Sequence, residues 1–369
     1  MDTCPMGRGR VLCQASSQPP TRVGTPGADG PAPMENTVSA STNPRAILDG
    51  ADPLAIDLEA AADSIAEQIR ESLRTLGRRG AVVATSGGID SSVSAALAVR
   101  ALGPKRVQLL RLPERDIPGN ESSDLGLMLA NHLGAPTAEE NISAALEGMG
   151  CYRWRDEAIR MVVPDYQPDW KHKIVRSAPT GGIVVFSLVV EKPDGTQETH
   201  RFPSEAYRLI IAATNMKQRV RKLMEYSYAD KLHYAVIGTP NLLEFDQGFF
   251  VKGGDGLADI KPIAGLYKSQ VYAMARHLGL PDPIASRQPT TETFSIPQTQ
   301  EEFYFGHPYD RMDLLVWGEK NDVPAAELAP LTDIDAEGVE AAYAQIQRVR
   351  DATAYLHAYA ITIEPSEAG

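Results

Sequence analysis

Cysteine, positive charge and long apolar runs are all scarce in this 369-residue chain. The three cysteines, Cys4, Cys13 and Cys151, form neither a disulfide framework nor a zinc-binding spacing, so we expect reduced thiols. No apolar stretch follows Arg8 and Arg10 as it would in a secretory signal, and no segment is long enough to span a membrane. We therefore expect a cytoplasmic protein with no membrane partner. The formal net charge of −12 argues against nucleic acid as a partner, because phosphate backbones require a basic surface.

Proline, glycine, serine and threonine dominate the N-terminal region, which has no apolar periodicity. We predict that residues 1–45 form a disordered tail, that residues 46–360 form one domain, and that residues 361–369 are a flexible C-terminus. With 43% apolar residues, the chain is able to bury a substantial core.

Predicted strands and helices alternate along the domain. An amphipathic helix over residues 51–76 comes first, with apolar residues three or four apart. The strands are expected at 81–84, 106–112, 137–142 and 233–238, and the later helices at 93–102, 123–133, 204–229, 269–278, 309–317 and 339–355. Alternation of this kind predicts an α/β fold with a doubly wound, Rossmann-like parallel sheet, whose ligand lies at the carboxyl ends of the strands.

The loop after the first predicted strand has the sequence Ser-Gly-Gly-Ile-Asp-Ser-Ser over residues 86–92. Gly87 and Gly88 allow positive φ and a close approach of backbone N–H groups to an anion, and the serines add hydroxyl donors beside a helix N-terminus. Asp90 would repel a phosphate unless a divalent cation lies between them, which indicates Mg²⁺. A plain strand-to-helix turn with a serine cap is the alternative. Neither a Walker loop nor a dinucleotide fingerprint is present.

A second polar cluster follows the strand that ends near residue 238. It contains Glu244, Lys252, Asp259 and Lys268 among several glycines. Loops after parallel strands hold binding groups, so Glu244 is expected to complete a Mg²⁺ site with Asp90, and the two lysines to meet phosphate or carboxylate. The alternative is a solvated loop with surface salt bridges.

These motifs carry a resemblance to a known family. Residues 86–91 match the Ser-Gly-Gly-x-Asp-Ser signature of the ATP pyrophosphatases, which implies an adenine nucleotide α-hydrolase-like fold and cleavage of ATP to AMP and pyrophosphate. Gly-Thr-x-x-x-x-Glu at 238–244 and Gly-Phe-Phe-x-Lys-x-Gly-Asp-Gly at 248–256 then resemble the ammonia-dependent NAD synthetases. The resemblance covers the chain from about residue 65 to residue 350.

The resemblance also implies roles for individual residues. Catalysis is assigned to Asp90, Lys268 and Asp255, and Mg²⁺ binding to Asp90 and Glu244. The ATP-binding set is Ser86, Gly87, Gly88, Ile89, Asp90, Ser91, Ser92, Thr239, Lys268 and Thr290. The set that holds the acid substrate is Arg219, Arg221, Lys252 and Asp259.

The implied reaction is amide formation on the nicotinate carboxylate of deamido-NAD. ATP converts the carboxylate to an acyl-adenylate, because oxide is a poor leaving group, and ammonia then displaces AMP. The roughly 80 residues before the phosphate loop are too few for a fused glutaminase domain, so we expect free ammonia or ammonia from a separate glutaminase. Family resemblance also implies a homodimer.

Several positions depart from the family pattern. The family has a helix with the pattern Asn-x-x-Ala-Arg-x-Arg-Met, here residues 215–222, in which Gln218 and Lys222 replace the alanine and the methionine. The His-Lys pair that the family has near its C-terminus does not occur here. Residues 151–205 are an insertion, in which β-rich runs flank Pro-Asp-Gly at 193–195 and predict a β-hairpin. These departures leave open a paralogue that acts on a different carboxylic acid. A sulfur transferase that uses Cys151 and a non-catalytic nucleotide-binding protein are further alternatives.

Overall fold

The computed structural model describes residues 52–117, 121–176, 186–290, 293–300 and 304–363. The predicted disordered tail, residues 1–45, lies outside the described residues, as do residues 364–369 of the predicted C-terminus. Within the described ranges, no helix is both long and apolar enough to cross a membrane.

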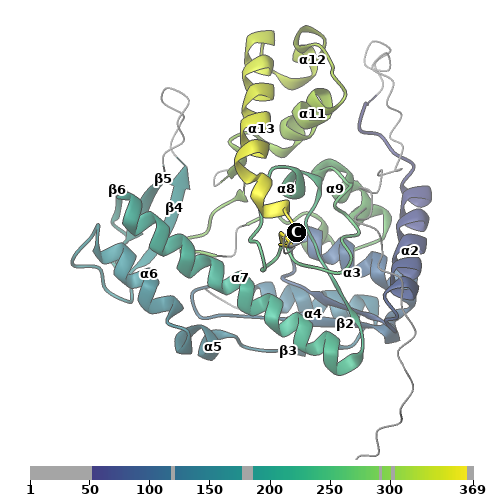
Figure 1. The fold of residues 1–369 in the computed structure, drawn as a ribbon, viewed down its shortest axis with the longest axis horizontal. Coiled ribbons are helices and arrows are strands. Elements are labelled where there is room, and N and C mark those ends of the chain that lie inside the picture. Colours follow the sequence, from purple (N-terminus) through teal and green to yellow (C-terminus); the bar gives the residue numbers. More distant parts are fainter. Residues whose placement is uncertain (1–51, 118–120, 177–185, 291–292, 301–303, 364–369) are drawn as a thin grey trace, which may run out of the picture. The chain divides into compact units, whose positions relative to one another are not determined.

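The central sheet has four parallel strands in the order β3-β2-β1-β7 (Figure 1). They are β1 (Ala81–Ala84), β2 (Val107–Arg111), β3 (Thr137–Glu139) and β7 (Ala235–Ile237). β1 pairs with β2 and β7, with Ala81 opposite both Val107 and Ala235. The chain adds β2 and β3 on one side of β1 and β7 on the other. The topological switch point, where ligands bind in such sheets, therefore lies between β1 and β7.

Both faces of this sheet are covered, which confirms the predicted doubly wound α/β fold. Along β1, Ala81 and Val83 face one core and Val82 faces the other, as the two-residue period of a strand requires. The first core also contains α2 (Leu58–Thr75), α3 (Ile89–Leu102), α4 (Glu121–Leu133) and α9 (Lys268–His277). The second contains α5 (Ser143–Gly148), α6 (Cys151–Arg160) and the 29-residue α7 (Ser204–Leu232).

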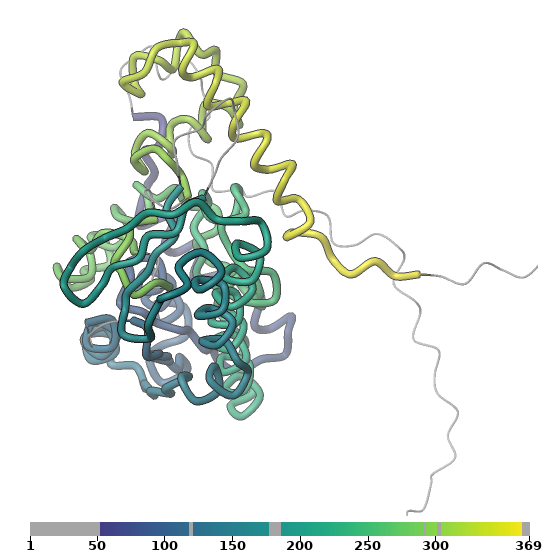
Figure 2. Tube along the Cα trace, turned by 90° about the vertical axis from the view of Figure 1, so that its left-hand side faces the viewer, coloured from purple at the N-terminus to yellow at the C-terminus, as the bar shows by residue number. Residues whose placement is uncertain are grey.

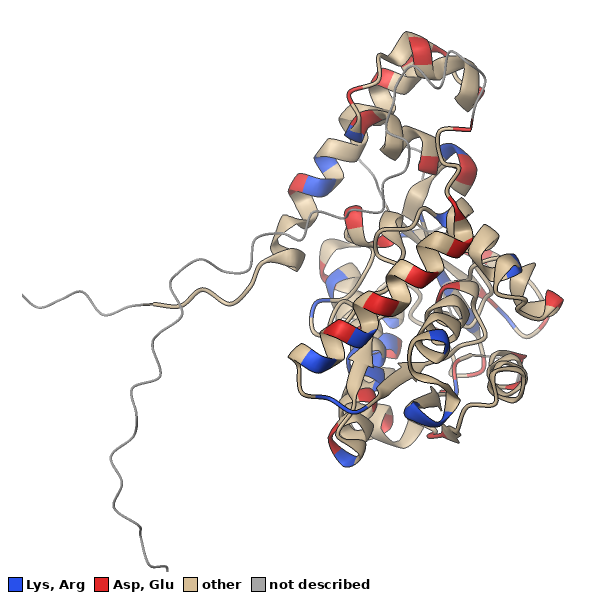
Figure 3. Ribbon diagram, turned by 90° about the vertical axis from the view of Figure 1, so that its right-hand side faces the viewer, with Lys and Arg blue, Asp and Glu red and all other residues tan. Residues whose placement is uncertain are grey.

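Helix boundaries differ from the predictions where capping decides them. The first helix begins at Leu58 rather than near residue 51, because the Asp57 side chain accepts a hydrogen bond from Ala60 N and caps it. α7 continues to Leu232, and His233, which the pattern predicted to start a strand, is its left-handed C-cap with φ 59°. Acidic and basic residues both occur along α2, coloured red and blue in Figure 3.

The inserted region forms an antiparallel sheet of three strands in the order β4-β5-β6. These are β4 (Lys171–Arg176), β5 (Phe186–Glu191) and β6 (Gln197–Arg201). The predicted hairpin is confirmed as β5 and β6, whose turn places Gly195 at φ 84°. β4 was not predicted. Its Ile174 packs with Leu188 of β5 and Ile210 of α7, so the sheet is built against the N-terminal part of α7 (Figure 1).

The C-terminal part is helical. It comprises α11 (Tyr309–Lys320), α12 (Ala325–Thr332) and α13 (Ala336–His357), which lie together in the trace (Figure 2). They form a further apolar core with α8 (Leu242–Asp246). The helices expected at 309–317 and 339–355 are confirmed. α12, which contains Pro330, was not predicted. The short helices η1 (Pro104–Arg106) and α10 (Asp282–Ala285) complete the described elements.

Candidate active site

The predicted phosphate loop lies at the carboxyl end of β1, beside the switch point. Gly87 has φ 72°, and a Cβ atom there would lie 2.4 Å from Cβ of Leu125, so only glycine fits. Gly88 is the N-cap of α3 and no side chain caps this helix. The hydroxyl groups of Ser91 and Ser92 instead donate to Gly88 O, at 3.0 and 2.8 Å. The first N–H groups of α3 are therefore available to an anion, which favours phosphate binding over the serine-capped turn.

Asp90 is held by residues that come from the other side of the switch point. Asn241 Nδ2 donates to Asp90 Oδ1 at 3.0 Å, and the fully buried Lys268 forms an ion pair with Asp90 Oδ2. Lys268 begins α9, where Asp313 of α11 accepts hydrogen bonds from the backbone N–H groups of Lys268 and Ser269. Two segments that are distant in sequence thus converge on one carboxylate, and α11 holds the second of them in place.

Asn241 also fixes Glu244. Its side chain accepts from Glu244 N while Glu244 Oε2 accepts from Asn241 N, both at 3.1 Å, which is a capping box at the start of α8. Our sequence analysis named Glu244 but missed Asn241. The pattern of asparagine followed three residues later by glutamate was the available signal.

The donor set of Asp90 and Glu244 fits Mg²⁺. Burial, and then the charge of Asp90, raise the pKa of Glu244 to about 8. A divalent cation shared by the two carboxylates would relieve this repulsion. Within the described ranges, no group of three or more metal-ligating side chains is found. Mg²⁺ commonly takes only one or two protein carboxylates together with substrate phosphates, so a two-carboxylate site is sufficient.

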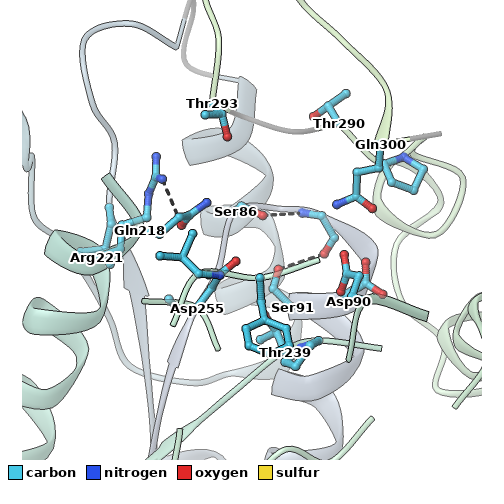
Figure 4. A pocket seen from close by; sticks show the side chains of 18 of the residues that line it. Ser86, Asp90, Ser91, Gln218, Arg221, Thr239, Asp255, Thr290, Thr293 and Gln300 are labelled. Carbon is cyan, nitrogen blue, oxygen red and sulfur yellow. Dashed lines mark hydrogen bonds between the residues drawn. The ribbon is translucent and has the colours of Figure 1, made fainter. Parts of the chain in front are cut away.

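A cavity of about 460 Å³ opens at the switch point (Figure 4). Gln218 and Arg221 of α7 lie across it from Thr290 and Gln300, with Ser86 of the phosphate loop between them and Asp90 on the Gln300 side. The cavity is large enough for much of a nucleotide. The predicted residues that line it are Ser86, Gly88, Ile89, Asp90, Ser91, Arg221, Thr239, Glu244, Asp255 and Thr290.

Six of the predicted site residues do not line this cavity. Gly87 and Ser92 shape the loop from behind, and Lys268 acts through Asp90. Arg219, Lys252 and Asp259, predicted to hold the acid substrate, are exposed.

Two of these exposed residues are joined to each other and to the C-terminal segment, and Asp259 is bonded to β7. Arg219 donates to Lys252 O at 3.3 Å, and Lys252 Nζ donates to Tyr355 O and Ala358 O, both at 2.7 Å. Asp259 Oδ2 accepts from Val236 N. Arg219 and Arg221 diverge because residues two apart on a helix point to nearly opposite sides. The role of the three residues in acid binding stays a prediction.

A buried charged group that the sequence analysis did not predict lies at the Arg221 end of the cavity. Lys222 Nζ and Glu225 Oε2 of α7 form an ion pair at 2.8 Å, with both side chains buried. Burial raises the pKa of Glu225 and that of nearby Asp255, which accepts a hydrogen bond from Val251 N at 2.7 Å. Lys222 was noted in the sequence only as a departure from the family's methionine.

Arg287 is a further cavity residue missed in the sequence. Its guanidinium donates to Ser86 O at 3.1 Å and to Ser122 Oγ at 3.2 Å. It thereby brings positive charge to the phosphate loop and ties that loop to α4. No local pattern around residue 287 distinguishes it from a surface arginine.

Behind the cavity, Lys217 of α7 is the centre of a buried network. Its Nζ donates to Glu114, Asp116 and Thr293 O, at 2.8, 2.8 and 3.0 Å. Burial acts to raise the pKa of Asp116, but Lys217 and Arg155 hold it at about 2. The network joins the loop after β2, α6, α7 and the segment that begins at Thr293.

Cys151 lies beside this network and is free and buried. Its Sγ donates to Ala213 O at 3.2 Å, and burial raises the pKa of the thiol to about 11. A sulfur carrier requires an accessible thiolate. The environment of Cys151 therefore gives no support to the sulfur-transfer alternative.

A parallel sheet with an anion-binding loop, paired carboxylates and a cavity at its switch point defines an α/β nucleotide-binding enzyme. The family model for NAD synthase matches residues 61–165 and 194–351. The chain belongs to the NAD synthase family, whose members are ligases that form C–N bonds. The family model leaves residues 166–193 unmatched, within the insertion predicted at 151–205.

One curated relative agrees with this assignment, and two solved structures share the fold. The chain is 52% identical over 319 residues to the NH(3)-dependent NAD(+) synthetase of Rhizobium meliloti (strain 1021), an alignment that covers 86% of this chain and 95% of that protein. Its fold is similar to NH3-dependent NAD synthetase from Campylobacter jejuni, with TM-score 0.55 and 20% identity over 84% of this chain and all of that chain. NMN synthetase from Francisella tularensis has TM-score 0.58 and 22% identity, covering 84% of this chain and 99% of that one.

Proposed function

We propose that this chain is an ammonia-dependent NAD synthetase that amidates deamido-NAD with ATP and Mg²⁺. The observation that carries the proposal is the set of contacts on Asp90, in which Asn241 and Lys268 converge on the carboxylate at the phosphate loop. The curated relative at 52% identity bears this activity in its name.

The phosphate loop is proposed to bind the triphosphate of ATP through the N–H groups at the start of α3. Arg287 and the buried Lys268 add positive charge. Asp90 and Glu244 would hold Mg²⁺, which would neutralise phosphate charge when bound. Charges preorganised around the cavity would lower the barrier without a covalent nucleophile on the protein.

The first chemical step joins the nicotinate carboxylate to the α-phosphorus of ATP. A carboxylate oxygen forms the new P–O bond, the bond to the β-phosphate bridging oxygen breaks, and pyrophosphate leaves. Ammonia then attacks the carbonyl carbon and forms the C–N bond. The C–O bond to the phosphate oxygen breaks, AMP leaves with that oxygen and the electron pair, and a proton is lost from nitrogen. Asp255 is proposed to accept that proton, because it lines the cavity and burial raises its carboxyl pKa.

Arg221 and Lys222 are proposed to meet the anionic groups of the acid substrate at their end of the cavity. The ammonia is proposed to be free or to come from a separate glutaminase. The replacement of the family's methionine by Lys222 places a buried ion pair where an apolar side chain is expected, so a related mononucleotide acid is tested as the second candidate substrate.

A homodimer is proposed from the exposed apolar side chains near α7 and the C-terminus. Five of these are Leu223, Leu257, Tyr359, Ile361 and Ile363. Exposed apolar surface of this kind marks interaction sites. A cytoplasmic location is proposed because the buried Cys151 is unpaired and both ATP and deamido-NAD are intracellular metabolites.

The test is NAD formation by the full-length protein with ATP, Mg²⁺ and ammonium, using deamido-NAD or nicotinate mononucleotide as the acid. We expect pyrophosphate release and NAD formation with deamido-NAD, and loss of both by at least about a hundredfold in Asp90→Ala. Glu147→Ala, which removes an exposed carboxylate, is the matched control and should retain activity. Turnover of the mononucleotide alone would replace the first candidate by the second. Bound ATP without turnover of either acid would contradict both.

A further inference from the structure

The cavity follows one face of α7 for most of that helix. Lining residues recur every three or four positions, from Tyr207 through Ile211 and Gln218 to Glu225. Eighteen residues at 1.5 Å rise correspond to about 27 Å of helix. Gln218 and Arg221 lie beside the phosphate loop (Figure 4), so Tyr207 lies about three helical turns away from that point, in contact with Phe186 of the inserted sheet.

The far end of the cavity is aromatic, and one of its rings comes from the inserted sheet. Phe186, the first residue of β5, stacks on Tyr207 of α7 with ring centroids 5.3 Å apart and an interplanar angle of 17°. Both rings line the cavity and both residues are only half-buried. Phe186 belongs to residues 166–193, which the family model does not match.

The inserted sheet also fixes the opposite wall of the cavity. The N–H of His172 in β4 donates to Ser295 Oγ at 2.8 Å, and Ile296 N donates to His172 O at 3.1 Å. Arg176, at the end of β4, donates to Tyr304 O. The segment held in this way contributes Thr293, Phe294, Gln300 and Tyr304 to the cavity lining.

We propose that Phe186 and Tyr207 form a stacking surface for a planar heteroaromatic ring of a nucleotide substrate, so that the inserted sheet helps to determine which substrate binds. The proposal rests on the proposed function. It assigns to the insertion a contact with substrate rather than packing alone. Parallel aromatic rings beside a cavity accept another flat ring by offset stacking, which excludes water from both faces of the stack.

Two of the proposed substrates, ATP and deamido-NAD, carry a planar heteroaromatic ring. A hydrogen-bonding pocket would be expected to select one base, but stacking accepts any ring with a π-face. The two substrates are distinguished by measuring the binding of each ligand separately.

The experiment compares three variants of the full-length protein. Phe186→Leu removes the ring and keeps apolar volume, and Phe186→Tyr keeps the ring. Phe202→Ala is the matched control, because Phe202 touches Tyr207 edge-on at 6.1 Å and does not line the cavity. Thermal unfolding first establishes that each variant is folded. Calorimetry then gives the dissociation constants of a non-hydrolysable ATP analogue with Mg²⁺ and of deamido-NAD, and steady-state kinetics gives KM and kcat.

We expect Phe186→Leu to weaken binding of one ligand by roughly 5- to 100-fold, with a matching rise in its KM and a smaller change in kcat. Phe186→Tyr and Phe202→Ala should stay within about threefold of the parent protein. A folded Phe186→Leu protein that binds both ligands within about twofold of the parent overturns the stacking role. If the parent protein makes no NAD yet Phe186→Leu still weakens the ATP analogue, the proposed function fails and the stacking role stands.

Discussion

Removal of Asp90 is predicted to destabilise the protein, and further removal of Lys268 to restore much of the loss. The Lys268 side chain is 0% exposed and its ammonium group faces the Asp90 carboxylate. Burial acts to lower the pKa of Lys268, but Asp90 and Glu244 raise it, so the group is charged. Asp90→Ala leaves a buried charge without its partner, which costs about 3–5 kcal/mol in comparable cases.

The neighbouring carboxyl group of Glu244 determines where in that range the destabilisation by Asp90→Ala falls. Once Asp90 is gone, the pKa of Glu244 falls from about 8, because one of its two main causes is the charge of Asp90. Glu244 then ionises more readily and offsets part of the charge of Lys268. We therefore expect Asp90→Ala to cost about 3 kcal/mol, the lower end of the range. The double variant Asp90→Ala with Lys268→Met should lie within about 1.5 kcal/mol of the parent protein.

Urea unfolding of the ligand-free proteins, followed by circular dichroism, gives the free energy of unfolding of four proteins. They are the parent, Asp90→Ala, Lys268→Met and the double variant, which together form a double-mutant cycle. The matched control is Glu147→Ala, which breaks an ion pair with Arg115 in which both side chains are at least half exposed. That change should cost no more than about 1 kcal/mol. The reasoning is refuted if Asp90→Ala unfolds within about 0.5 kcal/mol of the parent, or if the double variant is less stable than the single one. NAD formation should be lost in Asp90→Ala and in the double variant, so the double variant regains stability without regaining activity.

Three other outcomes are expected. Gly87→Ala should abolish NAD formation and cost more than about 2 kcal/mol in urea unfolding, because its Cβ would meet Leu125, whereas Gly77→Ala, with φ 63° and open space around it, should cost about 1 kcal/mol. Burial lowers the pKa of His172 from 6.5 to about 3, so unfolding takes up a proton between these values and stability falls as the pH falls through 6.5. The free energy of unfolding should therefore be about 2 kcal/mol lower at pH 5 than at pH 8. A His172→Gln protein that loses as much stability as the parent over this range would contradict the prediction. Cys151→Ala should form NAD at a rate within about twofold of the parent protein, because the thiol is buried and protonated. Loss of turnover in a folded variant would favour the sulfur-transfer alternative.

Local patterns in the sequence were sufficient for the parallel strands and for the phosphate loop. Ala81 to Ala84 are apolar on both faces of a strand, and only glycine suits position 87, so these features follow from short-range chemistry. The hairpin at residues 193–195 was likewise readable from its turn residues. Family resemblance then supplied the reaction, which the comparisons with known proteins support.

Capping and periodicity carried information that the sequence analysis used only in part. The asparagine at 241 and the glutamate at 244 have the spacing of a capping box, and this contact fixes Asn241 beside Asp90. The two-residue spacing of Arg219 and Arg221 on a helix shows that they face different ways. It does not show which one faces the cavity, because that depends on what packs against α7.

The sequence by itself determined the fold class, the anion-binding loop and the chemistry that these imply, because each depends on neighbouring residues. Tertiary structure alone decided which groups meet. Lys268 reaches Asp90 across 178 positions of the chain, and Phe186 reaches the cavity only because β4 and β5 pack against α7 and the segment after Thr293. Contacts of this kind are set by how strands and helices pack together, which no short stretch of sequence encodes.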